Sequence, residues 1–300
     1  MGVMNTSEES AASIPPEGMR IGDIRWTAWI LIGLCLACLG LLYAYTFTYW
    51  YRIWMMKESY YSHGILVPFI SAFLVYLKRK RLAAARIEPS ALGYLILIPA
   101  LAATVLAIVS GTGSAPGLTF PVVLAAVSMI LMGRVMTREL ALPIGYLYFM
   151  CVLPGFILVQ ASFRIQMLST MLGTAILNVL GLHAERLGAM ITLPNIEVMV
   201  GAPCSGFRLL ISLFAFSVLF AYVKEGPWWG KAVLIGLTLP LSVLLNGIRV
   251  TMIAIVGEYM GSEAMHSFHD YSGYLMLVLA FVLLSLLARF VKCRNFSSML

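Results

Sequence analysis

The chain has 300 residues, of which 61% are hydrophobic and 11% are charged, and its mean hydropathy is +0.93. A soluble domain carries roughly 45–50% apolar and about 25% charged residues. Because so few charges cannot cover a water-facing surface, the composition excludes a typical soluble enzyme, a disordered chain and a disulfide scaffold. The remaining classes are a channel, a carrier and an enzyme that works inside the bilayer.

The net charge of +7 does not indicate a nucleic-acid partner. The basic residues are not interleaved with aromatic residues on one stripe. They form short clusters between apolar runs, such as the four consecutive basic residues 78–81. Polytopic membrane proteins mark their cytoplasmic loops in this way, so the expected environment is the lipid bilayer.

The apolar runs predict an all-α polytopic membrane protein. We expect a polar cytoplasmic tail at 1–25, a transmembrane domain at 26–290 and a short cytoplasmic tail at 291–300. A transmembrane helix needs about 20 apolar residues. By this measure the sequence predicts about eight transmembrane helices, at 26–49, 64–82, 91–110, 117–133, 140–158, 205–223, 231–256 and 272–290.

The distribution of Lys and Arg predicts the orientation of these helices. An even number of helices places both termini on one side, and the cytoplasmic side is the one with more basic residues. With the N-terminus inside, six of the 20 basic residues lie outside, namely Arg52, Lys57, Arg164, Arg186, Arg208 and Arg249. The sequence therefore predicts that both termini are cytoplasmic.

Two features are expected between the fifth and sixth helices. Residues 159–182 have apolar residues at helical spacing with polar residues among them, which is typical of an amphipathic helix in the outer interface or of a re-entrant helix. Residues 190–193 and 196–200 are short β-like runs around Pro194-Asn195. They predict a small extracytoplasmic hairpin.

Polar residues that are costly in a membrane collect at the outer ends of the last three helices. They are Cys204, Arg208, Arg249, His266 and His269. Ionisable residues in membrane segments are candidates for functional sites. A nucleophile, two cations and two possible bases at one membrane depth indicate a functional site more specifically than any one of these residues does.

Cys204 is the candidate nucleophile. It lies in Pro-Cys-Ser-Gly directly before a predicted helix, where the helix dipole and the amide N–H groups favour a thiolate. The same N–H groups can receive an oxyanion. A lone cysteine is more often a buried structural residue, but Arg208 and the downstream histidines favour the catalytic interpretation.

Arg249 lies deep in an apolar helix, where an arginine costs at least ~2.5 kcal/mol unless it is paired or hydrated. Its fork of donors suits a substrate carboxylate or an oxyanion. The alternative is a structural ion pair, for example with Glu258. Asn246 precedes Arg249 by one turn and either supports it or bonds between helices.

Imidazole is the natural acid or base toward a thiol near neutral pH. We prefer His269 to His266 because it is closer to the last helix, and adjacent Asp270 could orient it. His63 also maps to the outer face, where a role in the site and a place in an aromatic belt are equally expected. A metal site built from these histidines and Cys204 is disfavoured because ligating carboxylates are scarce, so neither a metal nor a cofactor is expected.

These motifs, in this order, resemble the exosortase/archaeosortase family. Pro-Cys-Ser-Gly at 203–206 begins one helix, Asn246-x-x-Arg249 lies in the next, and His-Asp-x-Ser-Gly-Tyr at 269–274 enters the last. The segment from Tyr61 to Pro68, followed by a basic cluster, is similar to that family's N-terminal signature. The resemblance covers roughly residues 45–290.

The resemblance implies a membrane cysteine protease or transpeptidase with Cys204, Arg249 and His269 facing outward. It implies exported surface proteins as substrates, each with a C-terminal sorting tail made of a Pro-Glu-Pro-like (PEP-CTERM) motif, one membrane span and a basic end. It further implies an inner-membrane location in Gram-negative bacteria and a link to exopolysaccharide production. Arg208 is expected either to bind the acidic residue of the tail motif or to pack.

The rival hypothesis is a multi-pass transporter or channel in which Arg208 and Arg249 bind an anion and His269 relays protons. It predicts charges throughout the bilayer depth, whereas the candidate residues collect at one face. The sequence leaves open the exact tail, the acyl acceptor, the histidine that acts with Cys204, and the oligomeric state.

Overall fold

Helices make up most of the protein. The computed structural model describes residues 26–57, 59–201 and 206–293. The predicted tail at 1–25, Cys204 and most of the predicted tail at 291–300 lie outside the described residues. The helical elements are α1 (Trp26–Leu42), α2 (Ala44–Met55), η2 (Ser62–Leu66), α3 (Val67–Leu77), α4 (Arg79–Ala84), α5 (Leu92–Val109), α6 (Ala115–Tyr146), η3 (Leu147–Met150), α7 (Gly155–Val179), α8 (Phe207–Val223), α9 (Trp228–Gly236) and α10 (Thr238–Phe290).

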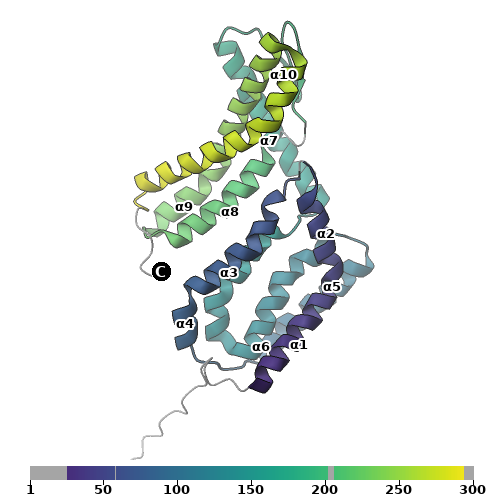
Figure 1. Ribbon diagram of the computed structural model, residues 1–300, viewed down its shortest axis with the longest axis vertical. Coiled ribbons are helices and arrows are strands. Elements are labelled where there is room, and N and C mark those ends of the chain that lie inside the picture. The colour runs from purple at the N-terminus through teal and green to yellow at the C-terminus, as the bar shows by residue number, and fades with distance from the viewer. Residues whose placement is uncertain (1–25, 58, 202–205, 294–300) are drawn as a thin grey trace, which may run out of the picture.

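The molecule is elongated, and the two halves of the chain occupy its two ends (Figure 1). Helices α1 to α6 form the lower part of the view, whereas α7 and the middle of α10 extend to the upper end. Helix α5 packs on α6, and both α7 and α8 pack on α10. An apolar cluster joins the halves, because Trp50 of α2 and Leu74 of α3 belong to the same core as Ala215 of α8.

The first predicted transmembrane helix is a bent pair. Helices α1 and α2 meet at an angle of 62°. Between them lies Tyr43, which is fully buried. Its hydroxyl is 3.0 Å from Thr104 Oγ1 and 2.8 Å from Thr119 Oγ1. These contacts tie the bend to α5 and α6.

Two long helices are interrupted by glycines with positive φ. Helix α6 breaks at Gly133 (φ 85°), where the backbone of Glu88 comes close. Helix α10 breaks at Gly261 (φ 84°). The sequence predicted separate helices at 231–256 and 272–290, but the structure is helical up to the break and again directly after it, so residues 262–271 belong to a helix.

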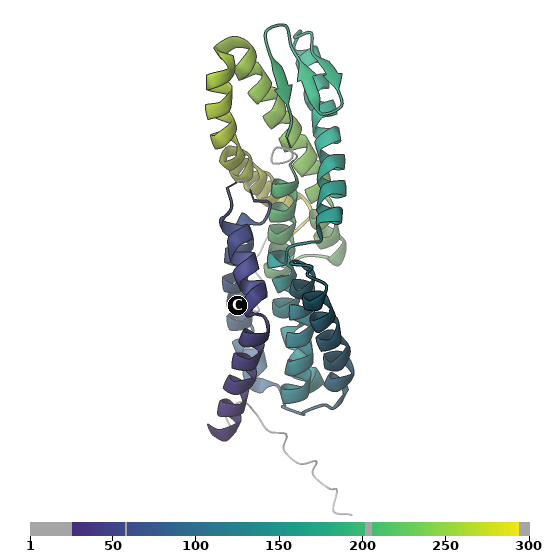
Figure 2. The same ribbon diagram turned by 90° about the vertical axis from the view of Figure 1, so that its right-hand side faces the viewer.

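A small antiparallel sheet extends from the end of α7 (Figure 2). Its strands β1 (Glu185–Leu187), β2 (Met190–Thr192) and β3 (Glu197–Met199) lie in the order β1-β2-β3. Thr192 pairs with Glu197, so the predicted hairpin around Pro194-Asn195 is confirmed. The sequence missed β1, whose three residues are all exposed. One face of the sheet packs through Ile191 and Val198 into a core shared with α7 and α10.

Several helices of the described residues are long and apolar enough to cross a membrane. Four helical stretches pass by length and composition, or up to five if the bent pair is one span. The four are Leu92–Val109, Ala115–Met150, Gly155–Val179 and Trp228–Phe290. Two shorter apolar helices, Ser62–Leu77 and Phe207–Val223, fall below that length. The protein is therefore an all-α polytopic membrane protein, whereas the count of eight spans and the orientation stay predictions.

Helix α7 is one of the candidate spans, although the sequence predicted an interfacial or re-entrant helix there. Its 25 residues include buried Ser162, Ser169 and Thr170. These small polar side chains face protein, because α7 packs on α10. The interfacial placement of 159–182 stays a prediction.

Candidate functional site

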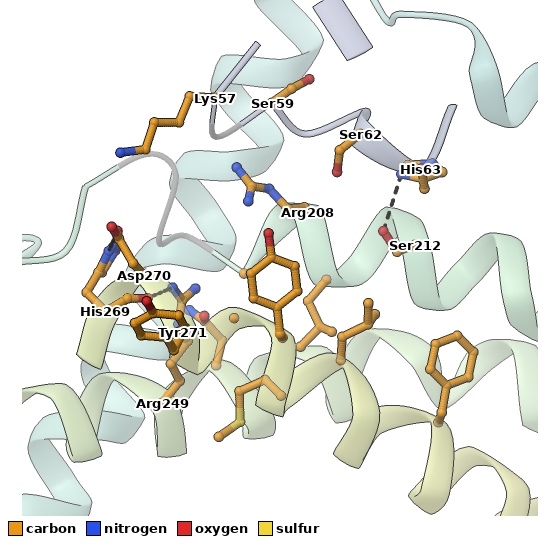
Figure 3. A pocket seen from close by; sticks show the side chains of 18 of the residues that line it. Lys57, Ser59, Ser62, His63, Arg208, Ser212, Arg249, His269, Asp270 and Tyr271 are labelled. Atoms are coloured by element: carbon orange, nitrogen blue, oxygen red, sulfur yellow. Dashed lines mark hydrogen bonds and ion pairs between the residues drawn. The ribbon is translucent and has the colours of Figure 1, made fainter. Parts of the chain in front are cut away.

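A cavity of about 610 Å³ lies where α8 meets α10 and the segment between α2 and η2 (Figure 3). Six residues selected from the sequence line it: His63, Arg208, Asn246, Arg249, His269 and Asp270. His266 does not line it and is exposed. Cys204 lies outside the described residues, but Gly206, two residues later in the sequence, lines the cavity.

Gly206 directs the chain into α8 in a way that another residue cannot. Its φ of 81° lies in the left-handed region, and a Cβ atom there would be 2.8 Å from both Cβ and Cγ of Asn246. Asn246 itself is only 1% exposed. Gly206 therefore packs directly on α10, and Arg208 is the second residue of α8.

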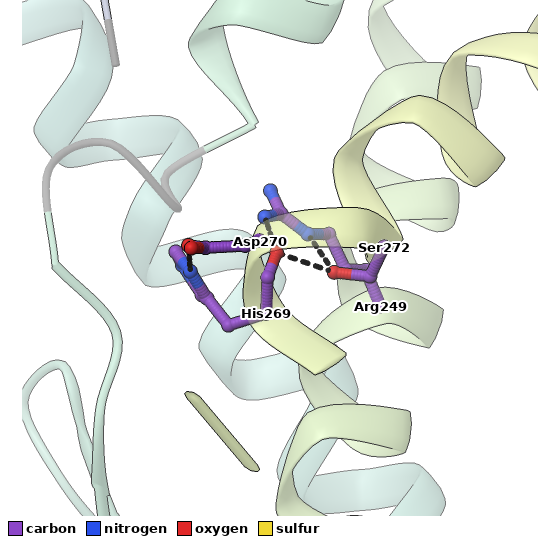
Figure 4. A network of polar contacts seen from close by, with 4 residues as sticks. All are labelled: Arg249, His269, Asp270 and Ser272. Carbon is purple, nitrogen blue, oxygen red and sulfur yellow. Dashed lines mark hydrogen bonds and ion pairs between the residues drawn. The ribbon is translucent and has the colours of Figure 1, made fainter. Parts of the chain in front are cut away.

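Arg249 holds the backbone of α10 on the far side of the Gly261 break (Figure 4). Its Nε donates to Ser272 Oγ at 2.9 Å, and its Nη2 donates to the main-chain carbonyl of His269 at 3.1 Å. Ser272 is 1% exposed, and its hydroxyl donates to the same carbonyl at 3.0 Å. Arg249 thus fixes the backbone of the residue that the sequence selected as acid or base.

His269 and Asp270 are in contact, although adjacent residues on a helix usually point apart. His269 Nδ1 lies 3.5 Å from Asp270 Oδ1, at the outer limit of a hydrogen bond. The His269 side chain is 24% exposed and that of Asp270 is 57% exposed. The contact is solvated and contributes little binding energy, but it orients the ring at the cavity edge.

Arg208 is half-buried, and two of its three guanidinium nitrogens lack a hydrogen-bond partner within the described part of the chain. Its Nε and Nη2 atoms are buried and have no hydrogen-bond partner among the residues that the structure describes. In Figure 3 its side chain points into the space between Lys57 and His63. A guanidinium stays protonated in proteins, so this wall of the cavity carries a positive charge.

His63 forms the opposite end of the cavity and is fixed by its neighbours. Its Nδ1 lies 3.3 Å from Ser212 Oγ of α8, and its ring stacks on Tyr61 with centroids 6.1 Å apart. The Tyr61 hydroxyl accepts a hydrogen bond from the Leu153 amide at 3.1 Å. Burial raises the pKa of Tyr61 to about 12, so its phenol stays neutral at physiological pH.

Glu258, the ion-pair partner considered for Arg249, is engaged elsewhere. Its carboxylate accepts hydrogen bonds from the Asn195 amide at 3.1 Å and from Asn195 Nδ2 at 2.6 Å. Asn195 belongs to the turn between β2 and β3. Glu258 therefore fastens the hairpin to α10.

Sequence reasoning missed several residues of the cavity. Lys57, Ser62, Ser212 and Ser272 were not selected, although the first three line the cavity and Ser272 supports it. Ser272 follows His269 by three residues, which is one helical turn, and that spacing was a usable signal. Within the described part of the chain, no group of three His, Cys, Asp or Glu side chains is arranged to hold a metal ion.

A comparison with family models identifies the chain at the level of a family. The model described as transmembrane exosortase (Exosortase_EpsH) matches residues 50–286. No curated protein and no solved structure matches the chain. The matched region contains every candidate site residue and covers most of the 300 residues, which confirms the resemblance seen in the motifs. The chain belongs to the transmembrane exosortase family.

Proposed function

We propose that this protein is a membrane-embedded cysteine transpeptidase or protease that cleaves the C-terminal sorting tail of exported proteins. Family membership supports a membrane transpeptidase in general. The observation that supports the proposed site most is the shared cavity, in which Arg249 and His269 lie with Gly206, two residues after Cys204 in the sequence.

The proposed reaction is acyl transfer in two steps. The Cys204 thiolate attacks a peptide carbonyl just outside the membrane span of the substrate, and Arg249 stabilises the oxyanion electrostatically. His269 gives its proton to the leaving amine, and a thioester remains on Cys204. A water or an amine then attacks the thioester and passes a proton to His269, and the Cys204 thiolate leaves.

The proposed setting is the outer side of an inner membrane. The excess of basic residues on the predicted inner side favours cytoplasmic termini and a cavity that faces the periplasm or exterior. The substrate tail, with its own membrane span, reaches such a site by lateral diffusion. A PEP-CTERM-like motif and a link to exopolysaccharide production belong to this proposal as its substrate and context.

The rival transporter hypothesis is less well supported. The candidate residues share one cavity, and the family that matches is named for sorting enzymes and not for carriers. An anion carrier also needs no nucleophile, whereas Cys204 lies directly before the segment that lines the cavity.

The test is to follow a co-expressed tailed protein by gel shift. The wild-type protein should shorten it, and Cys204→Ala and Cys204→Ser should leave it uncut. Cys38→Ala is the matched control, because Cys38 is exposed on α1 and does not line the cavity. Unchanged processing by stably expressed Cys204→Ala would overturn the proposed function.

A further inference from the structure

We infer that Arg208 and Lys57 form a subsite that binds the carboxylate of an acidic side chain in the substrate segment that occupies the cavity. Both residues line the cavity, on the side opposite Arg249 and His269 (Figure 3). The inference rests on the proposed function. It makes Arg208 a residue that selects substrates with an acidic side chain at this position.

The first observation is the missing partner of Arg208. Its Nε and Nη2 are buried without a hydrogen-bond partner among the described residues. Leaving buried donors of a charged group unsatisfied is costly. Because arginine cannot relieve this cost by losing its proton, a ligand with acceptor oxygens would stabilise the site.

The second observation is the geometry of the two atoms. Nε and Nη2 lie on one edge of the guanidinium, and their N–H bonds are parallel. That edge matches the two oxygens of a carboxylate, which accept parallel hydrogen bonds from it. A single backbone carbonyl offers only one oxygen, so it satisfies this edge less well.

The third observation is the charge balance of the cavity. Three of the described lining residues, Lys57, Arg208 and Arg249, are cations, whereas Asp270 is the one acid among them. Asp270 is in contact with His269 at 3.5 Å and is 57% exposed. The cavity therefore has an excess of positive charge that an anionic ligand balances.

The rest of the cavity wall favours a peptide as the carrier of that carboxylate. Apolar side chains, among them Leu66, Leu209 and Phe216, line it beside the hydroxyls of Ser62 and Ser212. An extended peptide presents both apolar side chains and main-chain polar groups. A lipid headgroup offers a phosphate of similar chemistry, and the experiment distinguishes the two sources.

The experiment measures coupling between Arg208 and single acidic residues of the substrate. Coupling here means that the loss of kcat/KM on replacing an acidic residue depends on the presence of Arg208. A tailed protein is prepared in which each Asp or Glu near the membrane span is replaced in turn by Asn or Gln. With the wild-type enzyme, one replacement should lower kcat/KM by about 30-fold or more, because one partner of a desolvated charge pair is lost. With Arg208→Gln, the original and the replaced substrate should be processed at nearly equal, slow rates.

Two further variants control this measurement. Arg164→Gln removes an exposed arginine of α7 that does not line the cavity, and it should retain the wild-type dependence on the acidic residue. Arg208→Lys keeps the charge but loses the fork of donors, so it should give intermediate coupling. It also serves as the second variant if Arg208→Gln does not accumulate in the membrane.

Three results would overturn the subsite. In the first, the wild-type enzyme processes every amide substrate at the original rate. In the second, Arg208→Gln responds to the replacement as strongly as the wild type does. In the third, no substrate coupling is found, and phosphatidylglycerol in phosphatidylcholine vesicles raises the melting temperature of the wild type but not of Arg208→Gln. This result would show that the site binds a lipid headgroup. If Cys204→Ala is inactive while coupling is absent, only the subsite fails, whereas an active Cys204→Ala removes the proposed function and the subsite with it.

Discussion

Arg249 Nη2 donates a hydrogen bond to the main-chain carbonyl of His269 at 3.1 Å. The two residues lie on opposite sides of the Gly261 break in α10. The contact therefore joins the two parts of this helix at the cavity. It gives Arg249 a positioning role in addition to the electrostatic role proposed for it.

Arg249→Lys should lower the processing rate by about 100-fold, which is the usual effect of losing one donor that stabilises an oxyanion. A lysine cannot reach Ser272 Oγ and the His269 carbonyl with the geometry of the guanidinium. Arg164→Lys, at an exposed position on α7, is the control. A wild-type rate in Arg249→Lys, measured by gel shift, would show that the charge alone suffices and that the fork is dispensable.

Ser272→Ala should lower both stability and activity. The hydroxyl links Arg249 Nε to the His269 carbonyl, and its removal loses a hydrogen bond from a charged group, which costs about 1.5–3 kcal/mol. Thermal unfolding in detergent and the processing rate measure the two effects. Ser217→Ala is the matched control, since Ser217 is also fully buried but donates to the Phe214 carbonyl of its own helix, its one hydrogen bond among the described residues. Equal processing by the two variants would contradict a positioning role for Ser272.

The two histidines of α10 should behave differently. His269→Ala should reduce the processing rate by about 10²–10⁴-fold, the typical contribution of general acid–base catalysis. His266→Ala should remain close to the wild-type rate, because His266 is exposed and does not line the cavity. The reverse order of the two rates would assign the proton transfer to His266.

Gly206→Ala should damage the site more than a comparable glycine substitution elsewhere. Both Gly206 (φ 81°) and Gly181 (φ 82°) have left-handed backbones, so alanine costs about 1–3 kcal/mol of strain at either position. Only at Gly206 does the new Cβ meet a neighbour, namely Asn246, whereas Gly181 has open space. Gly181→Ala should keep its activity, and Gly206→Ala should lose it together with more of its thermal stability. Similar activity in both variants would show that the close packing of Gly206 on Asn246 does not matter.

Much of the candidate site could be predicted from the sequence because polar residues are conspicuous in an apolar chain. Arg208, Asn246 and Arg249 are polar residues within apolar sequence runs. Because such residues are costly in a membrane, they are recognisable as candidates for a functional site. The structure places all three on one cavity. The hairpin was predicted because alternating residues around Pro194-Asn195 form a local pattern.

The remaining features depend on contacts between distant parts of the chain. The helix over 262–271 was missed because its polar residues look like a loop, although Gly261 alone makes the break. Ser272 was part of the 269–274 motif but was not selected, because only its hydrogen bond to Arg249 shows that it supports the cavity. Strand β1 was missed because its exposed residues carry no apolar alternation, and pairing with β2 alone defines it.

The proposed mechanism requires a thioester on Cys204, and trapping that intermediate is its sharpest test. Hydroxylamine attacks a thioester, forms an acyl hydroxamate and releases the thiol. With the wild-type enzyme and a tailed substrate, mass spectrometry should therefore detect a product that ends in a hydroxamate. With Cys204→Ala, neither this product nor any cleavage should appear. Cleavage at the wild-type rate by Cys204→Ala, or a wild-type product without hydroxamate at saturating hydroxylamine, would contradict the claim.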